Sequence, residues 1–217
     1  MKRIALIHAV YVAIEPVKSA FQRVWPQARC VNLIDDALPS DLDRIGYIDE
    51  SIAKRIHGLT GLAVDAGADG VLFTCSAFGS AISQAAKSCS VPVLKPNEAM
   101  FEAALDQGKR IGMLATFAPS IPSMEEEFRE IAAARGVEAR LESFCVPDAM
   151  DAAKRGDIAL HNRLVAESAS RFEGFDTVLL AHFSTSQAAE AVQKRVSVPV
   201  LSAPSAAVIH MRGLIGG

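Results

Sequence analysis

The sequence lacks the charge pattern of a nucleic-acid-binding protein and the long apolar run of a membrane protein. Its 217 residues carry a net charge of −3, with both signs dispersed and no basic stripe. No apolar run reaches the length of a membrane-spanning helix. Residues 4–14, behind Lys2-Arg3, imitate a signal peptide, but His8 and Tyr11 interrupt them and no cleavage pattern follows. We therefore expect a soluble cytoplasmic protein with neither a nucleic-acid nor a membrane partner.

The sequence is also poor in cysteine and in phosphate-binding signatures. Its four cysteines form no CxxC pair and do not cluster with histidines, which disfavours a zinc site and a disulfide framework. Cys30, Cys89 and Cys145 are interpreted as buried apolar residues. The GxGxxG and Walker patterns are both missing, which disfavours nucleotide cofactors.

Short apolar runs alternate with longer helical patterns along the whole chain. The runs are rich in Val, Ile and Leu and alternate little, which indicates strands covered on both faces of a parallel sheet. The order predicts an α/β, doubly wound architecture. The expected strands are 3–9, 28–34, 70–75, 91–95, 109–115, 138–144, 177–182 and 198–202. The expected helices are 15–25, 48–66, 77–88, 97–106, 122–134, 151–172, 185–195 and 203–212.

The chain repeats itself at an offset of 107 residues. Segments 71–94 and 178–201 are identical at nine of 24 positions without a gap. Lys2-Arg3-Ile4 matches Lys109-Arg110-Ile111, and Phe21, Gly67 and Asp69 match Phe128, Gly174 and Asp176. This is too long a period for a solenoid. It predicts two similar parallel-sheet domains related by a pseudo-two-fold, with one active site between them.

In the repeat register Cys75 faces His182, and each is the last residue of an expected strand. Ligands bind beyond the carboxyl ends of parallel strands. A thiol that opens a helix feels the positive end of the helix dipole, which favours its thiolate. Imidazole exchanges protons near pH 7. Cys75 and His182 are therefore the candidate catalytic pair, against the alternatives of an inert buried cysteine and a core histidine.

Polar side chains surround the two candidates at the same expected strand ends. They suit a small anion held by hydroxyls and backbone N–H groups. His8 either hydrogen-bonds the ligand or orients a loop, and Ser123 either binds the ligand or caps a helix. The candidate substrate-binding residues are His8, Thr74, Ser76, Thr116, Ser120 and Ser184.

The duplicated halves, Thr74-Cys75-Ser76 and the segment Ala115-Thr116 to Ser120 and Ser123 resemble the aspartate/glutamate/hydantoin racemase superfamily. The resemblance spans the whole chain. It implies a cofactor-independent isomerase, a homodimer or higher homo-oligomer, and one catalytic cysteine in each half. Here the second cysteine is replaced by His182. It also implies a first domain of residues 1–98 plus 203–217 and a second of 99–202.

The resemblance implies that a small carboxylate or cyclic amide is racemised or epimerised. Cys75 and His182 would act as acid and base on opposite faces of the carbon next to the carbonyl, with no metal or organic cofactor. Two alternatives stay open. One is a family-type cis-trans isomerase, decarboxylase or lyase that uses Cys75 as a single thiol. The other is a non-catalytic protein that binds a small molecule.

Overall fold

The computed structural model describes residues 1–216, and the chain divides into two compact units. Unit 1 comprises Met1–Pro96 together with the chain from Ala207 on. Unit 2 comprises Asn97–Ala206. Each unit is an α/β layer structure built on a parallel sheet of four strands. This confirms the predicted fold class of two similar parallel-sheet domains.

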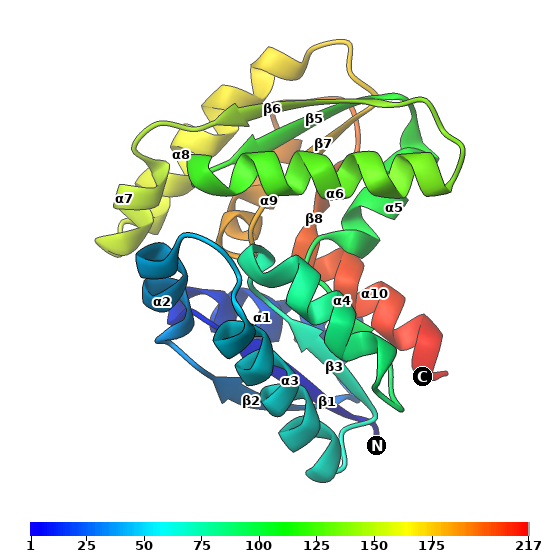
Figure 1. Cartoon of the computed structure of the whole chain (residues 1–217). Helices are drawn as coiled ribbons and strands as arrows, with labels where there is room; N and C mark the ends of the chain where they lie inside the picture. Colours follow the sequence, from blue (N-terminus) through cyan, green and yellow to red (C-terminus); the bar gives the residue numbers. More distant parts are fainter. Residues whose placement is uncertain (217) are drawn as a thin grey trace. The chain divides into compact units, whose positions relative to one another are not determined.

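Unit 1 has the strand order β2-β1-β3-β4 (Figure 1). Alternate strand residues, including Ala5, Ile7 and Phe73, pack against α3 and α4. On the opposite face a Cβ added at Gly70 would lie 2.7 Å from the sulfur of Met211 in α10, so that glycine permits close helix packing. Helices on both faces explain why the strands are apolar throughout. The elements are β1 Arg3–His8, α1 Ile14–Val24, β2 Arg29–Ile34, α2 Leu38–Ile45, α3 Glu50–Asp65, β3 Gly70–Phe73, α4 Gly79–Lys87, β4 Val93–Leu94 and the end of α10 Ala203–Ile215.

Unit 2 has the corresponding order β6-β5-β7-β8. Leu114, Val178 and Leu180 pack against α8 and α9 on one face. A side chain at Gly112 on that face would collide with the ring of Phe172. Helices α5 and α6 lie beside this sheet in Figure 1. They pack together through Phe101 and Phe128, whose rings meet edge to face. The elements are α5 Glu98–Gln107, β5 Arg110–Ala115, α6 Ile121–Ala134, β6 Arg140–Cys145, α7 Ala149–Lys154, α8 Ile158–Ser168, β7 Thr177–Leu180, α9 Ala189–Gln193 and β8 Val200–Ser202.

The internal repeat appears in the sheet registers. Ile4 pairs with Gly70 in one sheet and Ile111 pairs with Thr177 in the other, at residue numbers 107 apart. Asp69 accepts the Arg3 backbone N–H at 2.8 Å, and Asp176 accepts the Arg110 N–H at the same distance. Only the second strand of each unit departs from this offset. Arg3 pairs with Arg29 and Arg110 pairs with Arg140, residues 111 apart, so four residues are inserted before β6.

Two helical predictions were wrong in detail. Helix α2 was not predicted, although Pro39 near its start and Gly46 at its left-handed end (φ 85°) delimit it. The single helix expected over 151–172 is instead α7 and α8. They are separated at Gly156 (φ 79°), and the Asp157 carboxylate caps α8. A left-handed glycine ends one helix, and an aspartate after it caps the start of the next. The continuous apolar periodicity concealed both signals.

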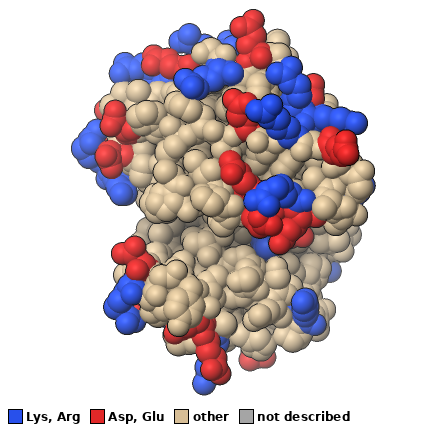
Figure 2. All heavy atoms as spheres, turned by 45° about the horizontal axis from the view of Figure 1, so that its top comes forward, with Lys and Arg blue, Asp and Glu red and all other residues tan. Residues whose placement is uncertain are grey.

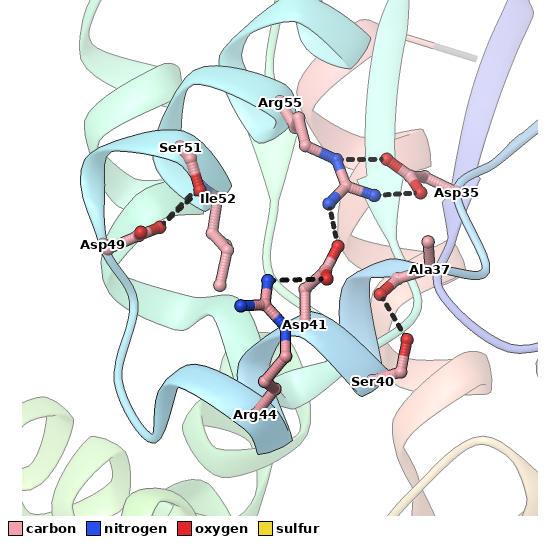
Figure 3. A network of polar contacts seen from close by, with 9 residues as sticks. All are labelled: Asp35, Ala37, Ser40, Asp41, Arg44, Asp49, Ser51, Ile52 and Arg55. Atoms are coloured by element: carbon pink, nitrogen blue, oxygen red, sulfur yellow. Dashed lines mark hydrogen bonds and ion pairs between the residues drawn. The ribbon is translucent and has the colours of Figure 1, made fainter.

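A polar network fastens the connection between β2 and α3 in unit 1 (Figure 3). Arg55 of α3 donates from Nε to Asp35 at 2.8 Å and from Nη1 to Asp41 at 2.6 Å, and its Nη2 also bonds Asp35. The Arg55 guanidinium, followed by that of Arg44, lowers the pKa of Asp41. The network ties α2 to α3 beside the carboxyl end of β2, which borders the candidate site of this unit.

Charged side chains of both signs are interspersed on the face shown in Figure 2. That pattern agrees with the dispersed charge of the sequence. Within residues 1–216, no helix combines the length and the apolar character needed to cross a membrane.

Candidate active site

Cys75 follows β3, at the carboxyl edge of the sheet of unit 1. Its backbone is extended (φ −119°, ψ 123°), and a 3₁₀ turn at Ser76–Phe78 leads from it into α4. The residue is half-buried. Burial raises the pKa of the Cys75 thiol, and a hydrogen bond from the Ala77 backbone N–H lowers it in part.

The sign of this pKa shift differs from the sequence expectation. A helix start was expected to favour the thiolate, but α4 begins four residues further on, at Gly79. The helix dipole acts only over about the first turn of a helix. One N–H group does not outweigh burial, so Cys75 is a protonated thiol at neutral pH. The other three cysteines are half-buried rather than fully buried, which corrects their interpretation as core residues.

His8 ends β1 beside Cys75 in unit 1 and has no free ring nitrogen. Its Nε2 lies 3.0 Å from Oδ1 of Asn32, and its Nδ1 lies 2.9 Å from Oγ1 of Thr74. A carboxamide oxygen only accepts, so Nε2 carries the proton and Nδ1 accepts the Thr74 hydroxyl. Burial lowers the pKa of His8, although the Asn32 bond opposes this, and the ring stays neutral. Of the two roles considered from sequence, orientation fits these contacts.

His182 occupies the equivalent position in unit 2, just beyond β7. Its Nε2 lies 2.7 Å from Oγ of Ser120, whose hydroxyl donates to the Phe117 carbonyl at 2.8 Å. Because the Ser120 proton is used, Nε2 donates and Nδ1 carries the free lone pair. That Nδ1 is buried and has no hydrogen-bond partner within residues 1–216. Burial lowers the pKa of His182 to about 4, so its imidazole is neutral at pH 7.

The backbone of His182 is left-handed, with φ 66°. Only one other non-glycine residue in the described chain, Asp148 at φ 59°, has positive φ. For a residue with a Cβ this conformation costs about 1–2 kcal/mol. The chain therefore leaves the sheet differently at the two equivalent positions, because Cys75 is extended. Such strain is concentrated at functional sites, which makes His182 a functional candidate on backbone grounds as well.

The remaining candidates lie beside these two residues, each within its own unit. In unit 2, Thr116 follows β5, and its Oγ1 lies 3.4 Å from that of Thr185. Ser184 is buried two residues after His182. In unit 1, Ser76 is half-buried. The hydroxyls of Ser76 and Ser184 make no hydrogen bond within residues 1–216, so they are free to donate to a ligand.

The structure thus gathers His8, Thr74, Cys75 and Ser76 at the carboxyl edge of unit 1. It gathers Thr116, Ser120, His182 and Ser184 at that of unit 2. Sequence reasoning missed Asn32. Its signal was a lone amide within the apolar strand Arg29–Ile34. Ser123 is not the helix cap that was considered, because α6 begins at Ile121 and the Ser123 hydroxyl donates to the Ser120 carbonyl at 3.0 Å.

The lowered pKa of His182 predicts a pH dependence of stability. An unfolded histidine takes up a proton near pH 6.5, but the folded ring does so only near pH 4. The unfolded state therefore binds more protons in this window, and stability falls as the pH drops from 6.5 to 4. The contribution of His182 is at most about 3 kcal/mol.

This prediction is checked by denaturant unfolding at several pH values, for the wild type and His182→Asn. The wild type should lose more stability than the variant between pH 6.5 and 4, because His8 titrates in both and cancels in the comparison. Parallel profiles for the two proteins would show that His182 is already solvated in the native state.

In residues 1–216, no three or more His, Cys, Asp or Glu side chains are grouped so that they could hold a metal ion. The candidates Cys75 in unit 1 and His182 in unit 2 each lie near hydroxyl-bearing side chains, Ser76 and Ser120 among them.

The sequence model of the protein family Asp/Glu/Hydantoin racemase matches residues 18–171 of this chain. Among curated protein sequences, none matches this chain. Solved structures are similar across nearly its whole length. Allantoin racemase from Klebsiella pneumoniae has a TM-score of 0.72 at 19% identity and covers 100% of this chain and 88% of its own.

Two further structures share the fold. Glutamate racemase from Francisella tularensis subsp. tularensis SCHU S4, in complex with D-glutamate, has a TM-score of 0.71 at 14% identity, with coverage of 99% of this chain and 81% of its own. A glycine-to-cysteine mutant of arylmalonate decarboxylase, in a sulfate-associated form, has a TM-score of 0.67 at 17% identity, with coverage of 99% and 94%. At these identities the structures establish a shared fold.

Proposed function

Because the chain belongs to the Asp/Glu/hydantoin racemase family, we propose that it inverts a carbon next to the carboxylate or amide of a small substrate. Proton transfer is the reaction, with Cys75 and His182 on opposite faces of that carbon. One observation carries this proposal. The two halves of the repeat place a proton-exchanging side chain at the same position, directly beyond the third strand of each unit.

The protonation states give each group a starting role. His182 is neutral and offers a buried Nδ1 lone pair, so it takes the α-proton of one enantiomer. Cys75 carries its proton, so it delivers that proton to the other face of the carbon. The C–H bond breaks on one face and a new one forms on the other. Turnover leaves His182 as an imidazolium and Cys75 as a thiolate. From that form the opposite enantiomer reacts by the reverse sequence, and proton exchange of both groups with solvent also restores the resting state.

Anchoring groups stabilise the negative charge that develops when the α-proton leaves. We assign this task to the hydroxyls of Ser76, Thr116 and Ser184. Thr74 and Ser120 have a secondary part in it. Ser76 and Ser184 have their donors free, whereas Thr74 and Ser120 already donate to His8 and Phe117. Donors placed where an enolate oxygen develops its charge typically contribute about 3–4 kcal/mol to the transition state. No metal or organic cofactor takes part in these steps.

The proposal is tested by proton NMR of candidate substrates in D₂O with the wild-type protein. The panel covers amino acids, hydantoins, maleate and substituted malonates. A substrate should lose its α-proton signal and its optical rotation together, because inversion passes through proton loss. If every small carboxylate and cyclic amide of the panel keeps its α-proton, the proposed function is wrong.

A decarboxylase is the second candidate, and the protonated thiol favours it. Loss of CO₂ from a malonate leaves a carbanion that needs only one proton donor, and Cys75 is such a donor. The fold is also shared with an arylmalonate decarboxylase. The same NMR panel separates the two candidates, because decarboxylation consumes the malonates and leaves the amino acids and hydantoins unexchanged. The homodimer and the cytoplasmic location implied by the family stay predictions.

A further inference from the structure

Unit 1 holds a hydrogen-bonded polar trio, two members of which are buried, that unit 2 lacks. Asn32 of β2, His8 of β1 and Thr74 beyond β3 form a continuous chain of hydrogen bonds of 3.0 and 2.9 Å. Strands β2, β1 and β3 are neighbours in the sheet, so the imidazole spans from one flank of β1 to the other. His8 and Thr74 are almost inaccessible to solvent, at 1% and 5% exposure.

The equivalent positions in unit 2 are mostly small and apolar. Ala115 ends β5 as His8 ends β1, and Ala181 precedes His182 as Thr74 precedes Cys75. Ser143 pairs with Met113 as Asn32 pairs with Leu6, and its hydroxyl has no partner within residues 1–216. The same sheet therefore folds without the trio. Buried polar groups cost free energy unless they are paired, so the presence of the buried His8 and Thr74 beside the thiol calls for a local reason.

Thr74 is the link between the trio and Cys75. Its backbone N–H donates to the Ile7 carbonyl at 3.0 Å, and its hydroxyl bonds His8. Both the main chain and the side chain of Thr74, the residue before the thiol, are thus hydrogen-bonded to β1. In unit 2, Ala181 has only the main-chain bond, to Leu114 at 3.0 Å, and the chain then turns left-handed at His182.

We propose that His8 is a positioning residue that fixes the Cys75 thiol through Thr74, with Asn32 as its anchor. Both ring nitrogens are used within the trio, so His8 acts through Thr74 and not on the substrate. Loosening the trio frees the strand end at residue 74 and lets water reach the thiol. The thiol then reacts faster with external electrophiles and aligns less well with a substrate. The catalytic half of this inference rests on the proposed function, whereas the thiol-reactivity half does not.

The test measures thiol alkylation and catalysis on the same variants. His8→Phe removes both hydrogen bonds at similar size, and His8→Gln keeps a donor and an acceptor. Iodoacetamide labelling at about pH 8.5, followed by peptide mass spectrometry, reports Cys75 separately from Cys30, Cys89 and Cys145. In His8→Phe, Cys75 should label about tenfold faster and the other three at wild-type rates. With the exchanging substrate, kcat should fall about tenfold and KM should change less than about twofold.

Further variants test whether the effect on Cys75 comes from the trio itself. Thr74→Val should reproduce His8→Phe, and the double variant should be no worse than either single one, because the two residues act as one unit. His8→Gln should recover part of the loss. Thr60→Val is the matched control: it removes another buried hydroxyl of unit 1, one that donates to Ile56 within α3, and should leave Cys75 labelling unchanged. If His8→Phe does not fold, Thr74→Val carries the same measurement.

Unchanged labelling of Cys75 in His8→Phe and Thr74→Val would overturn the inference. So would faster labelling of all four cysteines, which would indicate general loosening. An increase in KM at constant kcat would show that His8 contacts the substrate, and would overturn it too. If the wild type exchanges no substrate, the proposed function fails, but the labelling of Cys75 still decides whether the trio positions the thiol.

Discussion

Serine in place of Cys75 should remove nearly all solvent deuterium incorporation at the reacting carbon, a loss of about 10³-fold. General acid–base catalysis by a positioned side chain contributes about 10²–10⁴-fold, and a hydroxyl is a far weaker acid than a thiol. The replacement exchanges one small polar atom for another at a half-buried position, so the fold should persist. The measurement is the initial exchange rate by NMR in D₂O, with the substrate found in the screen.

Cys89→Ser is the matched control for this prediction. Cys89 is also a half-buried free cysteine of unit 1. It lines a hollow together with Thr60 of α3 and Ala85 of α4, away from the strand ends that carry the candidate residues. Its replacement should change the exchange rate by less than about twofold. A Cys75→Ser protein that keeps a tenth or more of the wild-type rate would show that the thiol does not carry the proton.

Asparagine in place of His182 should lower the inversion rate by about 10²–10⁴-fold while the folded protein stays as stable or gains stability. The imidazole is the proton acceptor of the proposed reaction. Asparagine has no group that titrates near neutral pH, and it tolerates the left-handed backbone better than histidine. Inversion kinetics and denaturant unfolding of the same preparation measure both effects.

Asp148→Asn separates backbone relief from catalysis. Asp148 has nearly the same backbone conformation as His182, lies in the same unit and is exposed. Its replacement should change stability by less than about 1 kcal/mol and leave the inversion rate unaffected. If His182→Asn unfolds the protein while Asp148→Asn does not, the imidazole has a structural role that the proposed function does not contain.

The repeat could be predicted from the sequence because it includes residues whose positions are fixed by contacts within each sheet. Asp69 and Asp176 each accept the backbone N–H of the first strand, so their positions are fixed relative to Arg3 and Arg110. The apolar strands followed from burial on both faces. Helix α2 was missed because it has only eight residues, too few for a clear periodicity.

The candidate site was only partly predictable. The positions of Cys75 and His182 at strand ends follow from local patterns, so they could be predicted. The protonation of both groups could not, because burial depends on residues far along the chain and reversed the sign expected for the thiol. The role of His8 also depended on a distant residue, since Asn32 lies on another strand. The left-handed backbone of His182 could not be predicted, because the position holds neither glycine nor asparagine, the residues that favour it.

The most direct test of a two-sided reaction is where solvent deuterium goes in the first few per cent of turnover in D₂O. Each pure enantiomer of the exchanging substrate is incubated with the wild type, and the two enantiomers are then separated and analysed by mass spectrometry. If Cys75 and His182 serve opposite faces, the inverted product carries deuterium and the unreacted substrate keeps its original proton, from either starting enantiomer. Equal deuterium in both pools would mean that one group serves both faces, and would contradict the account.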